Sequence, residues 1–143
     1  MQIAQLLESK GSLVATAGPE MLVVEVVKEL TERRIGALVV TDAHEEIVGI
    51  VSERDIVAAI ARFTAAILDE PVRKIMSTEV QTCSPNDAVE SLMATMTDQR
   101  IRHIPVIDGG RLSGIVSIGD LVKARMDELE RDRDALEHFI SAR

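Results

Sequence analysis

The chain has 143 residues, 46% of them hydrophobic, and a formal net charge of −8 at neutral pH, so it can bury the core of one ordinary domain or of two very small ones. It contains no tryptophan or tyrosine and only two phenylalanines; the shortage of aromatic platforms argues against single-stranded nucleic acid as a partner, and the acidic surface would repel a phosphate backbone. Cys83 is the only cysteine, which excludes an intramolecular disulfide and favours a reducing compartment.

The start of the chain and its longest apolar run give no sign of secretion or membrane insertion. The first ten residues, MQIAQLLESK, lack the basic start and the long apolar stretch of a signal peptide. The run over 56–68 contains Arg62 and is too short to span a bilayer. The sequence therefore predicts a soluble, cytoplasmic protein without a membrane partner.

The first half predicts a β-α-β-β-α order of elements. A short extended piece at 13–16 leads into a helix that begins at Pro19, a residue suited to a first helical turn. Apolar residues then recur at helical spacing, at positions 23, 26, 27 and 30. Two strands over 37–41 and 47–52 follow, joined by a polar turn, and a second helix begins at Ser52.

The second half predicts the same order. An extended piece at 80–83 precedes a helix that begins at Pro85, with Ser84 as its N-cap. Two strands over 103–107 and 111–117 are joined by a glycine turn. The last helix begins at Ser117 and has no proline, and no glycine after position 119. We therefore expect this helix to run well past the core.

The two halves are copies of one unit. Residues 19–35 match residues 85–101 at an offset of 66, and a one-residue gap then aligns GIVSERDI (49–56) with GIVSIGDL (114–121). Each copy has roughly 55 to 60 residues, near the lower limit for independent folding. The two copies are therefore expected to pack together around a pseudo-twofold axis.

The Ser-x-x-Asp stretch in each copy has two interpretations. Ser52 with Asp55, and Ser117 with Asp120, fit the capping box that starts a helix. The same geometry would present a hydroxyl and a carboxylate at a strand-to-helix junction, where the carboxylate can accept ribose hydroxyls and the helix N-terminus favours phosphate. The preceding glycine of each copy would let a ligand approach the backbone. Spacing alone favours the cap.

The ordered pair VATAGPE…GIVSERD and VQTCSPND…HIPVID…GIVSIGD resembles two CBS (cystathionine β-synthase) domains, which in tandem form a Bateman module. The resemblance covers about Ile3 to Met126. It implies an α+β fold of two β-α-β-β-α repeats with an extended C-terminal helix. The expected parts are a first motif at 1–62, a connector at 63–71, a second motif at 72–126 and a helical extension at 127–143.

The resemblance also implies two clefts for adenosine-type ligands, and in that context ligand contact by the two aspartates becomes the favoured interpretation. In each cleft, the Ser and Asp of one motif would face the opening segment of the other. The first cleft is expected to include Lys10, Ser12, Gly36, Ala37, Arg102, His103, Ser117 and Asp120. The second is expected to include Ser52, Arg54, Asp55, Thr78 and Val80.

Phosphate contact in this acidic chain needs a local positive charge. Arg102 is the main candidate because guanidinium groups suit phosphate, with His103 as a pH-sensitive helper. Lys10 and Arg54 are weaker candidates, because basic residues next to acids are usually solvated surface. The structural alternative is that Arg102 is a solvated charge at the start of a strand and that His103 is half-buried there without a ligand role.

The sequence shows no catalytic constellation. It has neither a P-loop nor a Gly-x-Gly-x-x-Gly fingerprint, its histidines lack metal-ligand spacing, and Cys83 is expected to be a buried structural thiol. The resemblance implies a non-enzymatic sensor that binds an adenine nucleotide as regulatory ligand, with AMP, ATP, NAD and S-adenosylmethionine left open. A homodimer and an effector protein are expected partners. The alternative is a structural dimerisation module with empty clefts.

Overall fold

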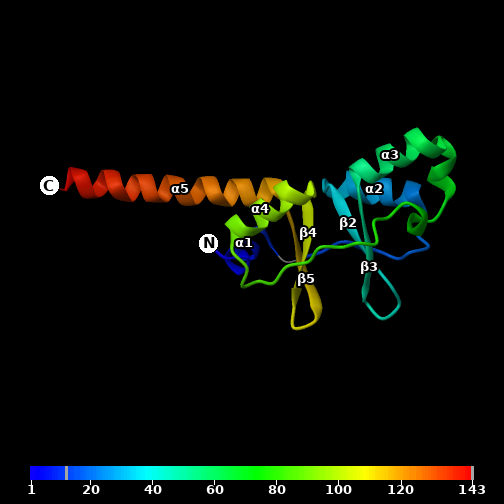
Figure 1. Ribbon diagram of the computed structural model, residues 1–143, viewed down its shortest axis with the longest axis horizontal. Coiled ribbons are helices and arrows are strands. Elements are labelled where there is room, and N and C mark those ends of the chain that lie inside the picture. The colour runs from blue at the N-terminus through cyan, green and yellow to red at the C-terminus, as the bar shows by residue number, and fades with distance from the viewer. Residues whose placement is uncertain (12, 143) are drawn as a thin grey trace. The chain divides into compact units, whose positions relative to one another are not determined.

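The computed structural model describes residues 1–11 and 13–142 and divides into two compact units (Figure 1). Unit one combines Met1–Ser12 with Thr82–Arg143, and unit two is Leu13–Gln81. Both units mix helices with a small sheet, so the expected α+β class is confirmed.

Unit two is built on a three-stranded sheet. β1 (Thr16–Ala17) runs parallel to β2 (Ala37–Thr41), which pairs antiparallel with β3 (Ile47–Ser52). The remaining elements are α2 (Val23–Arg33), α3 (Glu53–Phe63) and the short 3-10 helices η1 (Ala65–Asp69) and η2 (Val72–Lys74). The apolar stripe of α2 packs into the core of the unit, with Val23, Val26 and Leu30 buried.

Unit one repeats this plan around a hairpin. β4 (His103–Asp108) pairs antiparallel with β5 (Arg111–Ser117), and Cys83 forms a parallel bridge to Val106 at the position that β1 occupies in unit two. The helices are α1 (Ile3–Lys10), α4 (Val89–Gln99) and α5 (Ile118–Ser141). Branched aliphatic residues and methionine do most of the packing in both units, as a chain with so few aromatic residues requires.

The repeat extends to backbone detail. α2 and α4 both end at an arginine in the left-handed conformation, Arg34 and Arg100, each with φ of 55°. The strand register shifts after Val40 in β2 and after Val106 in β4. Both pairs are separated by 66 residues, the offset seen in the sequence.

The predicted helix starts at Pro19 and Pro85 are wrong. α2 begins at Val23 and α4 at Val89, four residues later in each copy. The residues in between form a turn instead: in the first copy, the Met21 N–H donates to the Gly18 carbonyl over 3.1 Å. Local proline preference thus marks the turn that leads into the helix, while the apolar stripe marks the helix itself.

Ser84 was predicted to cap the second of these helices, and this is also wrong. Its Oγ accepts from the Asn86 N–H over 3.3 Å, and its own N–H donates to the Asp87 carboxylate over 2.8 Å. The N-cap of α4 is Ala88, which makes no side-chain cap. Ser84 and Asp87 therefore close the preceding turn, a common use of short polar side chains.

α1 was not predicted, although its sequence carries a helical signal. Ile3, Leu6 and Leu7 stand at i, i+3 and i+4 and are all buried in the core of unit one. The start of the chain therefore packs with the second sequence repeat, because the second repeat offers the apolar surface that this stripe needs.

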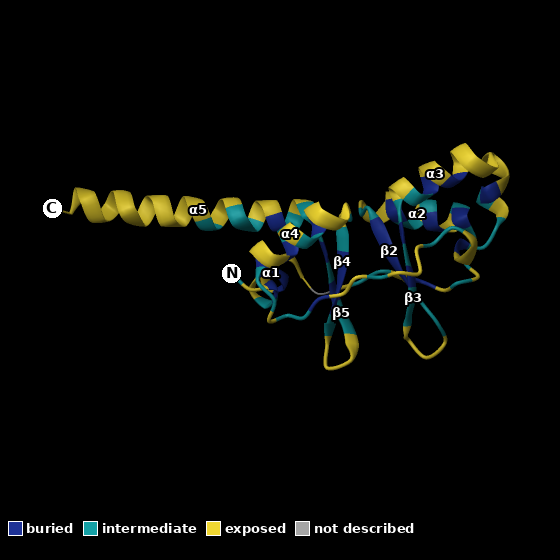
Figure 2. Ribbon diagram, viewed as in Figure 1, coloured by how far each residue is buried: buried dark blue, intermediate teal, exposed yellow. Residues whose placement is uncertain are grey.

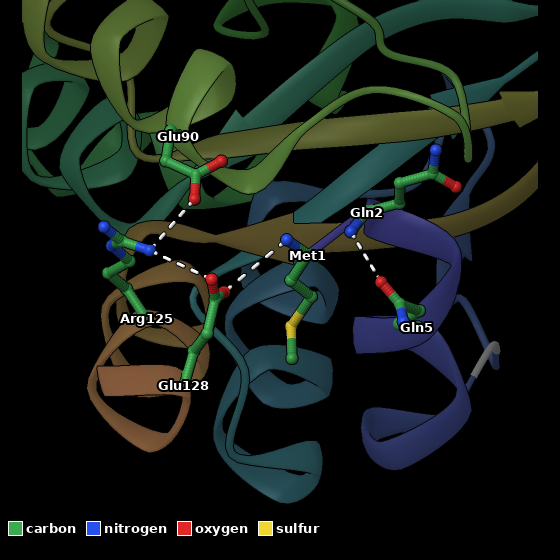
Figure 3. A network of polar contacts seen from close by, with 6 residues as sticks. All are labelled: Met1, Gln2, Gln5, Glu90, Arg125 and Glu128. Carbon is green, nitrogen blue, oxygen red and sulfur yellow. Dashed lines mark hydrogen bonds and ion pairs between the residues drawn. The ribbon is translucent and has the colours of Figure 1, made fainter. Parts of the chain in front are cut away.

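A polar network holds the first residues against α5 (Figure 3). The Met1 amino group lies 3.5 Å from the Glu128 carboxylate, and Arg125 bridges Glu128 and Glu90 over 3.1 Å each. The Gln2 N–H donates to the Gln5 side chain over 2.8 Å, which closes the first turn of α1. These contacts join α1, α4 and α5 within unit one.

The long last helix is confirmed. α5 runs over Ile118–Ser141, and within it only Leu121 is fully buried. From residue 129 onward the helix is exposed on every side (Figure 2). Among the helices of residues 1–11 and 13–142, none combines the length and the apolar composition that a membrane span requires.

Candidate functional site

The strand-to-helix junction of unit two forms a complete capping box. The Ser52 Oγ accepts from the Asp55 N–H over 3.3 Å at the start of α3. The Asp55 Oδ2 in turn accepts from the Ser52 N–H over 2.8 Å and from the Ser52 hydroxyl over 3.0 Å. The capping interpretation of this stretch is therefore confirmed at Ser52.

The junction of unit one has the same geometry at the start of α5. The Ser117 Oγ accepts from the Asp120 N–H over 3.1 Å, and the Asp120 Oδ2 accepts from the Ser117 N–H over 2.8 Å. Among the described residues, the hydrogen bonds to both aspartates end on Oδ2. The other carboxylate oxygen, Oδ1, takes no part in the cap, so capping and ligand contact are chemically compatible.

Asp120 differs from Asp55 because a cation reaches it. The Lys10 ammonium group, at the end of α1, lies 2.5 Å from Asp120 Oδ2 and donates to the Ile115 carbonyl over 2.6 Å. Partial burial of Asp120 opposes its ionisation, but the hydrogen bonds from Lys10 and Ser117 outweigh burial and lower the pKa of the carboxyl below its ordinary value. Asp120 is thus held as a carboxylate by its neighbours.

The segment that opens the second sequence repeat, at Ser77, meets the equivalent strand position of unit two with its backbone. Ser77 and Ile50 exchange two N–H···O bonds of 2.9 Å. Ile50 and Ile115 stand at the same place in the two GIVS stretches, so one strand carbonyl accepts a backbone N–H in unit two and an ammonium group in unit one. The two candidate sites are therefore built differently.

The residues after Ser77 were predicted to line the second cleft with Ser52 and Asp55. The pairing of Ser77 with Ile50 brings the start of this stretch next to β3. Thr78 is exposed and Val80 partly buried, while Arg54 is exposed on the first turn of α3. Their ligand roles stay predictions.

Gly49 packs tightly against the segment that opens the second repeat, and Gly114 packs tightly against α1. A Cβ at Gly49 would lie 2.6 Å from the Met76 sulfur, and one at Gly114 would lie 2.9 Å from the Leu7 side chain. Each glycine was predicted to let a ligand approach the backbone. In the structure an apolar side chain of the same unit occupies that space. The glycines serve close packing at these points.

Arg102 and His103 stand beside the α5 cap. The Arg102 carbonyl accepts from the Ile118 N–H over 2.9 Å, and His103 pairs with Ser117 in the hairpin. The structure thus brings both predicted phosphate-site residues to the Ser117 junction.

Gly36 and Ala37 occupy the equivalent place in unit two. The Gly36 carbonyl accepts from the Glu53 N–H over 3.0 Å, and Ala37 pairs with Ser52. Within their own unit they neighbour Ser52, whereas the sequence grouped them with Ser117, and that grouping stays a prediction. Ser12, also predicted for the first cleft, lies outside the described residues.

A pocket of about 210 Å³ opens between α1 and α5 in unit one. Its wall combines three cationic side chains with two acidic ones, although the chain as a whole is strongly acidic. It is smaller than the roughly 300–1,000 Å³ typical of drug-sized ligand pockets, so it has room for one part of a nucleotide. Its charged lining residues are Lys10, Asp120, Lys123, Asp127 and Arg131.

The remaining candidates for reactive chemistry are the single thiol and the side chains that could hold a metal ion. Cys83 is buried, and desolvation, reinforced by the charge of Asp87, raises its pKa to about 12. The expectation of a buried thiol is confirmed. Within 1–11 and 13–142, no three His, Cys, Asp or Glu side chains are placed to hold a metal ion.

Comparison with known proteins identifies the family. The protein-family model of the CBS domain matches the sequence twice, at residues 13–62 and 72–127. A crystal structure of a CBS-domain protein from Agrobacterium tumefaciens is 45% identical, with a TM-score of 0.85 over 87% of this chain and 99% of that one. A CBS domain protein from Pyrobaculum aerophilum, solved with AMP, is 29% identical, with a TM-score of 0.73 over 84% of this chain and 89% of that one. A CBS domain pair solved with 5′-methylthioadenosine and S-adenosyl-L-methionine is 25% identical, with a TM-score of 0.80 over 90% of this chain and 98% of that one.

Curated relatives differ in how much of them this chain spans. It is 35% identical to an Acidianus ambivalens protein, over 88% of this chain and 74% of that protein. It spans 35% of a relative from Thermofilum pendens and 59% of a mitochondrial CBS domain-containing protein from Arabidopsis thaliana. The chain belongs to the CBS domain family and carries two copies of the domain.

Proposed function

We propose that this chain is a regulatory module that binds an adenosine-containing ligand through Asp55 and Asp120 and performs no catalysis. The observation that carries the proposal is the cap geometry itself. At both junctions the capping bonds use Oδ2 of the aspartate and leave Oδ1 outside the cap. A carboxylate oxygen at a helix N-terminus is well placed to accept ribose hydroxyls.

The ligand class rests on relatives with related sequences and the same fold. AMP in one neighbouring structure, and 5′-methylthioadenosine with S-adenosyl-L-methionine in another, share only the adenosine part. We therefore assign adenosine as the recognised group and leave AMP, ATP, NAD and S-adenosylmethionine as candidates within that class.

The site in unit one suits a ligand that carries phosphate. Lys10, Lys123 and Arg131 line its pocket, and Arg102 stands at the adjoining junction. In the present arrangement Lys10 neutralises Asp120. Binding would redirect the Lys10 ammonium group from the carboxylate to the phosphate, which frees Asp120 for the ribose.

The wider role follows the same proposal. Ligand occupancy would change the balance between two arrangements of the module and so alter its contact with a second copy or an effector protein. We place this activity in the cytoplasm. Arg54, Thr78 and Val80 would complete the site of unit two, and Lys10, Arg102 and His103 that of unit one.

A structural interaction module is the second candidate. The observation in its favour is that both Ser-x-x-Asp stretches form complete capping boxes, which gives each serine and aspartate a structural role. On this interpretation the aspartates stabilise helix starts and the protein binds no nucleotide.

Thermal unfolding with a panel of adenosine ligands and matched guanosine ligands distinguishes the two. Binding to the folded state alone must raise the midpoint, by several degrees when ligand greatly exceeds its Kd. We expect a shift with at least one adenosine ligand, no shift with its guanosine counterpart, and loss of the shift in Asp55→Ala combined with Asp120→Ala.

Asp87→Ala provides the matched control. Asp87 also accepts from a serine N–H three residues earlier over 2.8 Å, but it belongs to a turn before α4. The Asp87→Ala substitution should lower the unfolding midpoint of the free protein, but the ligand should still raise that midpoint. If no adenosine ligand shifts the wild-type midpoint, the structural module is the correct conclusion.

A further inference from the structure

We propose that the exposed end of α5 is an antiparallel, two-stranded coiled-coil surface whose partner is the α5 helix of a second copy of this chain. The proposal does not depend on nucleotide binding. It rests on one stripe of residues, the seam, which alternates in steps of four and three. Its members are Val122, Met126, Leu129, Arg133, Leu136 and Ile140.

The seam is exposed, and all its members except Arg133 are apolar. Met126, Leu129, Leu136 and Ile140 are 57%, 50%, 59% and 60% exposed, and Val122 is 39% exposed. Steps of four and three place them at the a and d positions of a heptad, the pattern by which two helices pack. Scattered apolar residues on a surface need no explanation, but a continuous row marks an interaction surface.

The seam is not the face by which α5 packs on its own unit. Leu121 is fully buried, and Arg125 and Glu128 contact α4 and the Met1 amino group. At 3.6 residues per turn, the seam lies roughly a quarter turn from that face. From residue 129 onward every side chain is exposed, and a helical segment of this length gains little stability in water by itself. Packing against a partner helix would supply the stability that this segment lacks by itself.

The seam is self-complementary when two copies run antiparallel. A twofold axis beside Arg131 sets Val122 opposite Ile140 of the other copy, and Met126 opposite Leu136. It sets Leu129 opposite Arg133, so each layer recurs on both sides of the axis, as an isologous contact requires. A second copy therefore fills the seam without any residue left over.

Charge favours this orientation. Arg133 interrupts the seam, and a parallel pair would bring the two Arg133 side chains together in one layer and set Asp132 against Glu137. The antiparallel pair separates the arginines by about one turn. It brings the two Glu130 side chains, and the two Asp132 side chains, close together near the axis, and each Arg133 lies within a turn of these acids and offsets their repulsion. It also sets Lys123 near Glu137 of the other copy, which adds a pair of opposite charges.

Sedimentation equilibrium of the full chain tests whether the seam associates. We expect Leu129→Glu and Leu136→Glu to weaken one association step by about tenfold or more, because each buries an unpaired charge. Ala135→Glu is the matched control, since it adds the same charge on α5 on the side away from the seam and should leave association unchanged. Thermal unfolding would verify that all three variants keep a folded core. A monomeric wild type, or identical association in Leu129→Glu and Ala135→Glu, would overturn the proposal.

Cysteine cross-linking under mild oxidation tests the orientation. In the antiparallel pair, a mixture of Met126→Cys and Leu136→Cys chains forms a cross-linked heterodimer, while Met126→Cys chains alone do not cross-link. Wild type provides the background, as its only cysteine, Cys83, is buried. Efficient cross-linking of Met126→Cys alone would establish a parallel pair and overturn the antiparallel assignment.

Discussion

The Lys10 ammonium group lies 2.5 Å from Asp120 Oδ2, although the two residues are 110 positions apart in the chain. Lys10 ends α1 and Asp120 sits in the first turn of α5, so the ion pair joins the start of the chain to its last helix. The two side chains are 33% and 26% exposed. At the equivalent place in unit two, the hydrogen bonds that described residues donate to the Asp55 carboxylate come from its own cap. This difference separates two sites that the repeated sequence presents as equal.

Replacing Lys10 should reveal whether it serves phosphate. If the proposed function holds, Lys10→Met weakens AMP binding by about tenfold because a charge-assisted bond to phosphate is lost, and changes adenosine binding much less. Calorimetry with both ligands measures the effect. Lys74→Met, which removes a surface ion pair with Glu70 in unit two, is the control and should alter neither. Equal weakening of both ligands would contradict the phosphate role.

Acidification should weaken the fold through Asp120. Its folded-state pKa lies below the ordinary value of 3.8: burial opposes ionisation, but Lys10 and Ser117 stabilise the carboxylate more strongly. Such a group stabilises the fold above its unfolded pKa, and that contribution is lost as pH falls through the folded value. The free-energy difference between wild type and Asp120→Asn should be constant above about pH 5 and shrink below about pH 4. Urea unfolding over this range checks it; a constant difference to pH 3 would count against it.

The contact at Gly114 predicts a steric effect. An added Cβ would lie 2.9 Å from Leu7, so Gly114→Ala should lower the free energy of unfolding by about 1–3 kcal/mol, as overpacking does. Gly18→Ala is the control, because a Cβ there meets nothing within 4 Å. Chemical denaturation of both variants gives the comparison.

A double substitution isolates this contact. Leu7→Ala removes the side chain that Gly114→Ala would strike, so the two changes together should cost less than their sum. Strict additivity in a double-mutant cycle would show that the predicted clash is absent.

Cys83 should be inert in the folded protein. With a pKa of about 12, roughly one thiol in ten thousand is ionised at pH 8, and the side chain is buried. Labelling by a thiol reagent should therefore follow unfolding, with rapid reaction in denaturant and almost none without it. Fast labelling of the native protein would refute this expectation.

Local chemistry made much of the fold predictable. The strands over 37–41, 47–52 and 111–117 have the predicted bounds, because alternating or continuous apolar residues between turns define them. Ser52 and Ser117 cap their helices as expected, since at a strand-to-helix junction the serine hydroxyl can accept from the N–H three residues later. The helix starts at Pro19 and Pro85 failed because proline fits both a turn and a first helical turn, and only the backbone bonds distinguish them.

The order of elements, the capped junctions and the long last helix could thus be predicted from the sequence, because periodicity, turn and capping signals lie between residues close together in the chain. Tertiary structure alone decided that α1 packs with the second repeat, that Leu7 and Met76 fill the space beside the two glycines, and that Lys10 reaches Asp120. These contacts join residues far apart in the chain. Which residues meet in these contacts depends on which apolar faces can be buried together. A pattern along the chain shows that a face is apolar but does not show which other face covers it.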